Sequence, residues 1–155
     1  MTAASTTGPD NVRFGGPFGP AIPALQVQAG VLGSDQAISA TTDTLILTTA
    51  SLAVGTWAID MQAELTVTGA TASDAMIYAA TGSATAAFTG PIAADGELPA
   101  IAGGSLGLSL ACIATVTVAG TLQLRAYATQ AGTAKQYGTV TGSRAVTGYR
   151  ALRIA

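Results

Sequence analysis

The sequence contains no histidine and a single cysteine, Cys112. Without histidine, the chain lacks the base of Ser-His-Asp and Cys-His catalysis and has no imidazole to bind a metal ion. A single cysteine also excludes an intrachain disulfide and a cysteine-rich zinc site. We therefore expect a protein that is not an enzyme and that has no catalytic site, no metal and no cofactor.

Charge is scarce as well. Only 9% of the residues are charged, against about 25% in an average soluble domain. The formal net charge of −2 argues against nucleic acid as a partner. No apolar run approaches the length of a membrane span, and the first twelve residues lack the basic and apolar stretches of a secretory signal. We expect neither nucleic acid nor a membrane among the partners.

Small residues make up much of the chain instead. Alanine, threonine and glycine together account for 75 of the 155 residues. The length fits one domain with a short extension. So many small residues and so few charges favour β-structure whose surface is partly covered by a partner.

Residues 1–24 alternate glycine and proline, which disfavours both helix and sheet. This stretch also carries the large apolar side chains of Phe14, Phe18 and Ile22. It is either a disordered terminus or an extended arm that docks these side chains onto a neighbour. We therefore predict an arm over residues 1–24 and a folded domain over residues 25–155.

The folded domain shows a period of two, which is typical of β-strands. In the clearest run, residues 56–68, the side chains of Trp57, Ile59 and Met61 share one apolar face and are expected to anchor the core. A second long run covers residues 105–118. The other expected strands are residues 25–31, 44–49, 75–80, 84–88, 121–128 and 147–154.

Glycine-rich turns separate these runs, including an expected tight hairpin turn at Ala119-Gly120 and an expected turn at Asp95-Gly96. About eight strands with no helical period predict an all-β, antiparallel β-sandwich or barrel.

Three patterns resemble chemical sites but have simpler explanations. Residues 103–107 match the G-x-S-x-G nucleophile motif, yet the chain has no histidine and a strand pattern follows. Asp60 and Glu64 share a strand face, but their Cα atoms would lie roughly 13 Å apart at ~3.3 Å per residue, too far for a glycosidase pair. Cys112 falls among leucines and is expected to be an inert core thiol.

The charges divide along the chain. Residues 1–97 carry all eight acidic residues and one arginine, whereas residues 98–155 carry five basic residues and no acidic one. The two halves either interleave and pair within the chain, or place a basic edge against the acidic edge of a neighbouring subunit.

Three segments resemble a known family: GTWAID at 55–60, GTLQLRAY at 120–127 and GYRALRIA at 148–155. Their order is similar to the tumour-necrosis-factor-like and complement-globular-head-like jelly roll, in particular the versions in tailed-phage virion proteins. The resemblance implies an antiparallel jelly-roll β-sandwich and a homotrimer in which flat sheet faces meet at a threefold axis. The aromatic content of 5% departs from the cytokine-type relatives and argues against receptor signalling.

The same resemblance implies a structural role in a bacteriophage virion. A decoration or cement protein would be assembled in the host cytoplasm and would lie on the outer surface of the capsid, where its arm binds the major capsid protein. The short Gly/Pro arm favours this role. The alternative is a trimeric tail or fibre-tip protein that binds the host cell surface.

Overall fold

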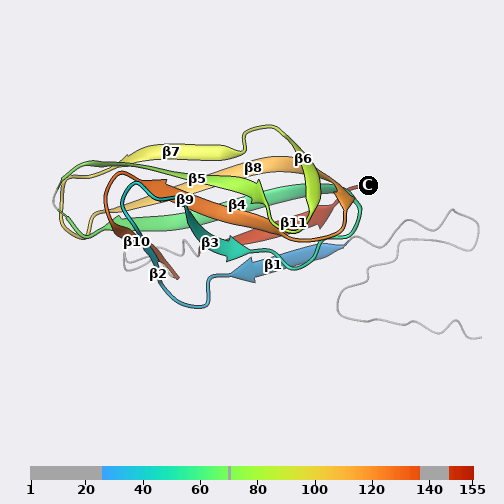
Figure 1. Cartoon of the computed structure of the whole chain (residues 1–155), viewed down its shortest axis with the longest axis horizontal. Coiled ribbons are helices and arrows are strands. Elements are labelled where there is room, and N and C mark those ends of the chain that lie inside the picture. Colours follow the sequence, from blue (N-terminus) through green and yellow to red (C-terminus); the bar gives the residue numbers. More distant parts are fainter. Residues whose placement is uncertain (1–25, 70, 137–146) are drawn as a thin grey trace, which may run out of the picture.

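The computed structural model describes residues 26–69, 71–136 and 147–155. The expected arm, with Phe14, Phe18 and Ile22, lies outside these residues. Across the described ranges the chain forms eleven β-strands and no helix, and the strands build two antiparallel sheets. Figure 1 shows the long strands of both sheets, such as β4, β8 and β9, running along the length of the molecule. The predicted all-β sandwich is confirmed.

The larger sheet is built around one long strand, β4. One edge of β4 pairs with β8, which in turn pairs with β6. The other edge of β4 is shared, because its first half pairs with β11 and its second half with β10. Beyond these, β1 pairs with β11 and β2 with β10. The bounds are β1 Val27–Val31, β2 Gln36–Ile38, β4 Gly55–Val67, β6 Thr85–Thr89, β8 Ser105–Val118, β10 Gly132–Lys135 and β11 Gly148–Arg153.

The smaller sheet has the order β3-β9-β5-β7. Its strands are β3 Thr44–Thr48, β5 Ser73–Thr81, β7 Ala93–Leu98 and β9 Leu122–Ala128. The chain crosses between the sheets at every connection from β2 to β10. Because β8 and β9 lie in different sheets, Ala119-Gly120 does not form the expected hairpin. The order β1-β11-β4-β8 opposite β3-β9-β5-β7 is that of a jelly roll.

The core lies between the two sheets and follows the period-two pattern of the sequence. Trp57, Ile59 and Met61 of β4 are 0%, 1% and 1% exposed. They face the smaller sheet, from which Ile77 and Leu124 also point inward. The indole N–H of Trp57 donates a hydrogen bond to the carbonyl oxygen of Ala53 at 2.9 Å. The one polar atom of this large side chain is thus satisfied inside the core.

Three strands were not expected from the sequence: β2, β7 and β10. The clearest correction concerns Asp95-Gly96, which was expected to form a turn but lies inside β7. A Cβ atom at Gly96 would lie 3.0 Å from Cδ2 of Leu106, so glycine here leaves room for a side chain of β8. The inward face of β7 is therefore filled partly by a neighbouring strand. The hydrophobic alternation that marks a strand is weak as a result.

Candidate functional site

One face of the seven-stranded sheet points away from the core. We call it the open face. It is made of three rows of side chains that cross β1, β11, β4 and β8 in register. The outward direction follows from strand alternation, because the residues between these rows, such as Ile59 and Met61, are buried. The rows are Val31–Gly148–Gln62–Ser109, Ala29–Arg150–Asp60–Ala111 and Val27–Leu152–Ala58–Ile113.

The open face carries little charge and little bulk. Two of its twelve residues, Asp60 and Arg150, are charged, and none is aromatic. At its edge, Val27 and Val31 are 49% and 59% exposed. The low charge of this face is a property that it shares with the cores of protein interfaces, which are depleted in charge.

Two shallow hollows lie side by side on the open face. The larger, of about 580 Å³, extends over the first two rows, and the smaller, of about 340 Å³, lies beside β6 and β8. Asp60 and Ala111 line both hollows. Gly148 lines the larger hollow, and a Cβ there would lie 2.6 Å from the carbonyl oxygen of Gly30.

Asp60 and Arg150 sit at the middle of the open face. They are directly opposite each other on β4 and β11, and both are exposed. Among the described residues, no ion pair or hydrogen bond involves either side chain. Burial is the larger cause that raises the pKa of the neighbouring Cys112 thiol, and the negative charge of Asp60 adds to it.

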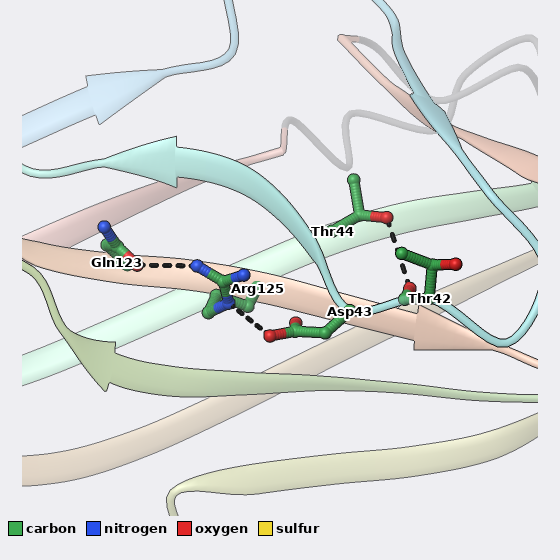
Figure 2. Close-up of polar contacts among 5 residues, drawn as sticks. All are labelled: Thr42, Asp43, Thr44, Gln123 and Arg125. Carbon is green, nitrogen blue, oxygen red and sulfur yellow. Dashed lines mark hydrogen bonds and ion pairs between the residues drawn. The ribbon is translucent and has the colours of Figure 1, made fainter.

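The outward face of the four-stranded sheet is different. Figure 2 shows Arg125 of β9 between Asp43 and Gln123. Its Nε donates to Oδ2 of Asp43 at 2.8 Å, and its Nη1 donates to Oε1 of Gln123 at 2.9 Å. Burial, followed by the nearby Asp43 carboxylate, raises the pKa of Tyr78 on β5. This end of the sheet is therefore a closed network of polar contacts.

At the other end of the same sheet lies a hollow of about 460 Å³. The register places Met76 between Asp95 and Tyr127 on neighbouring strands, and Asp74 opposite Glu97. The hollow thus combines an aromatic ring and a thioether with three carboxylates. No ion pair involves these three carboxylates within the described part of the chain.

Two ion pairs show where the acidic and basic halves of the chain pair with each other. Asp43–Arg125 and Asp35–Lys135, at 2.8 and 2.7 Å, each join the acidic half of the chain to the basic half. Local pairing is therefore confirmed for these four residues. Asp35 also accepts a hydrogen bond from the backbone N–H of Gln136, and the contacts with Lys135 and Gln136 lower the pKa of its carboxyl.

The sequence-based site residues fall into separate places. Trp57, Ile59 and Met61 are core residues, and the proposed capsid-binding side chains lie outside the described residues. Asp60 is exposed whereas Glu64 on the same strand is 4% exposed, so the two carboxylates differ in environment as well as position. The glycine at 103 lies in a turn, and Ser105 begins β8 rather than a helix.

Sequence reasoning did not identify the open face, although its signal was present. The outward-facing residues lie on four strands that are far apart in the sequence, and only the strand pairing brings them together. Across the described ranges there is no group of three or more metal-binding side chains and no helix suited to spanning a membrane. No family model, no curated protein and no solved structure matches this chain.

Proposed function

We propose that this protein is a non-enzymatic structural protein of a bacteriophage virion, a trimeric capsid decoration protein that clamps neighbouring major capsid subunits on the outer surface of the head. Support comes from the open face, because its few charges make it a surface suited to assembly. The jelly-roll strand order and the resemblance of residues 55–60, 120–127 and 148–155 point in the same direction.

The open face supports self-assembly for a physical reason. Burying its small and aliphatic side chains removes apolar surface from water at about 25 cal/mol per Å². Small side chains leave the sheet nearly flat, so that a second sheet can approach it closely. The cost of desolvation is low because charged groups are so few. Other copies of the chain meet these conditions with their own open faces, and the family resemblance implies three copies around a threefold axis.

Attachment to the capsid is assigned to residues 1–24. Phe14, Phe18 and Ile22 would bury their side chains on the major capsid protein, and the entropy cost of fixing the arm on the capsid would oppose part of that gain. One arm alone would bind weakly. Three arms on one rigid trimer raise the effective concentration of each and make the whole difficult to remove.

The test is co-sedimentation of purified protein with capsids that lack it. The full chain is expected to sediment with the capsids, and a chain without residues 1–24 is expected to keep its assembly state and melting temperature but to lose most of the binding. The double variant Phe14→Ala/Phe18→Ala should show a milder loss. Equal binding by the truncated chain would place attachment on the sandwich instead and contradict the role of the arm.

The alternative function, a trimeric tail or fibre-tip protein, is favoured by the hollow on the four-stranded sheet. If copies meet through the open face, this hollow lies on the outside of the assembly. Its ring and carboxylates are groups that contact the apolar faces and hydroxyls of sugars. Binding of the protein to host cells but not to capsids, with loss of binding in Tyr127→Ala, would favour this alternative.

A further inference from the structure

The middle row of the open face has a property that the neighbouring rows lack. It carries one acidic and one basic side chain, Asp60 and Arg150, on adjacent strands in direct register. The charged side chains that join the acidic half to the basic half elsewhere are engaged in ion pairs: Asp35 with Lys135 and Asp43 with Arg125. Within the ranges that the structure describes, Asp60 and Arg150 take part in no ion pair, although both line the larger hollow.

We infer that Asp60 of one copy pairs with Arg150 of a neighbouring copy, and that this pair sets the register in which open faces meet. The inference rests on the proposed assembly through this face. Symmetry-related copies each present one acid and one base, so every Asp60 that is covered can be matched by an Arg150 from a neighbour. The face is thus complementary to itself.

The same two charges disfavour other arrangements. A charge that is buried in an interface without a partner loses its hydration and gains no ion pair in return. Any register that separates Asp60 from Arg150 is therefore costly. Registers that bring two Asp60 or two Arg150 side chains together add like-charge repulsion. Two apolar faces without charged groups would meet in several registers of nearly equal free energy. A single acid and base at its centre therefore provide specificity.

Charge exchange tests this inference. Asp60→Lys and Arg150→Glu each leave two like charges on the face, and each is expected to raise the concentration for half-assembly at least about tenfold. The double exchange Asp60→Lys/Arg150→Glu in one chain should assemble again with itself. Asp95→Lys makes the same charge change on the outward face of β7, where Asp95 is exposed, and should assemble like the unchanged protein.

The decisive measurement is mixing. Affinity-tagged unchanged chain is refolded together with untagged double-exchange chain, and the amount of untagged chain recovered with the tag is measured. In the control, the untagged chain is the unchanged one. A pair between copies predicts at least about tenfold less recovery, because Asp60 then meets the introduced glutamate and Arg150 meets the introduced lysine. Asp95→Lys should be recovered like the control. Free mixing of the double-exchange chain means that the charges pair within one subunit and overturns the inference.

A second pair of variants covers the case in which the exchanged chains fail to fold. Asp60→Asn and Arg150→Gln remove each charge with little change in shape. Both are expected to weaken assembly and to reduce its dependence on salt, and unchanged salt dependence would overturn the inference. An unchanged chain that stays monomeric would refute the proposed assembly together with the inference. Assembly with free mixing would refute the inference alone, and failure to bind capsids would refute only the capsid role.

Discussion

At the residue scale, the largest side chains depend on close contacts that leave no spare volume. Trp57 is fully buried and hydrogen-bonded, and the ring of Tyr149 lies against the bare backbone of Gly30. Protein interiors are packed as densely as organic crystals, so both the removal and the addition of atoms at these positions lower stability. Substitutions at Trp57 and at Gly30 should therefore both lower stability, one by leaving space and the other by filling it.

Replacing Trp57 by alanine is expected to lower the free energy of unfolding by about 3–5 kcal/mol, because it leaves a large cavity between the sheets. Denaturant unfolding followed by circular dichroism measures this change. Val54→Ala is the control, since Val54 is 53% exposed and its truncation should change stability by less than about 0.5 kcal/mol. A Trp57→Ala protein as stable as the control would contradict the role of Trp57 as a core anchor.

Gly30→Ala is expected to cost about 1–3 kcal/mol through overpacking. A Cβ atom at Gly30 would lie 2.5 Å from Cε1 of Tyr149. The ring is not free to move away, because its hydroxyl accepts a hydrogen bond from the backbone N–H of Ala50 at 2.8 Å. Gly33→Ala is the matched control, since nothing lies within 4 Å of a Cβ there. Thermal melting of both variants measures the difference, and equal melting temperatures would count against this contact.

At the element scale, the short strands are held by contacts with distant parts of the chain. β2 has three residues and pairs with β10, which has four. Such short strands have little stability of their own. The Asp35–Lys135 ion pair and the hydrogen bond from the Gln136 N–H to Asp35 join the connection before β2 to the end of β10. This end of the sheet should therefore respond to the charge of Asp35.

The pKa of Asp35 is lowered from its ordinary value of 3.8 by the hydrogen bond from Lys135, and next by that from Gln136. A lowered pKa in the folded state means that the folded protein holds the proton less tightly than the unfolded chain. The stabilisation is therefore present above pH 3.8 and is lost as the pH falls through the lower, folded-state pKa.

We accordingly expect Asp35→Asn to melt at a lower temperature than the unchanged protein at about pH 7. The difference should shrink when the pH falls below the ordinary pKa of the carboxyl. Melting curves of both proteins from about pH 7 down to about pH 2 provide the measurement. A difference that stays constant over this range would mean that the carboxylate charge does not stabilise the fold. Because the pair is on the surface, added salt should weaken the effect.

At the scale of the whole molecule, the two outward sheet faces have opposite characters. The open face of the seven-stranded sheet carries mainly small and aliphatic residues with two charges. The outward face of the four-stranded sheet carries the Asp43–Arg125 ion pair and an acidic hollow. A lone subunit would expose both to water. Assembly through the open face would leave the polar face outside, which fits the proposed decoration role.

The proposed assembly through the open face, together with the threefold symmetry that the family resemblance implies, leads us to expect a homotrimer in solution. Light scattering after size exclusion should give about three times the 15.2 kDa chain mass at micromolar concentration. A large residue on the open face, as in Ala111→Trp, should prevent close approach of the sheets and release monomers. Met76→Trp on the opposite face is the control and should leave the mass unchanged. A monomeric unchanged chain would contradict the proposed assembly.

The sequence alone determined the β class, the two long strands and the inward direction of Trp57, Ile59 and Met61. Alternation of side chains is a local property of a strand, so it can be seen without knowledge of the strand's neighbours. The turn at residue 103 and the apolar environment of Cys112 could be predicted from the sequence for the same reason. The strand β7 was missed because a residue of β8 fills the space beside Gly96.

Only the tertiary structure decided which outward-facing residues share a surface. Asp60 and Arg150 are far apart in the sequence, and the register between β4 and β11 places them opposite each other. The pairing of β1 with β11 brings Ala29 into the same row, and the pairing of β4 with β8 adds Ala111. Together these pairings create the open face. Strand order and register depend on contacts between distant segments, which the pattern of one segment does not contain. The individual strands are therefore determined locally, whereas the surface proposed for assembly exists only in the folded sheet.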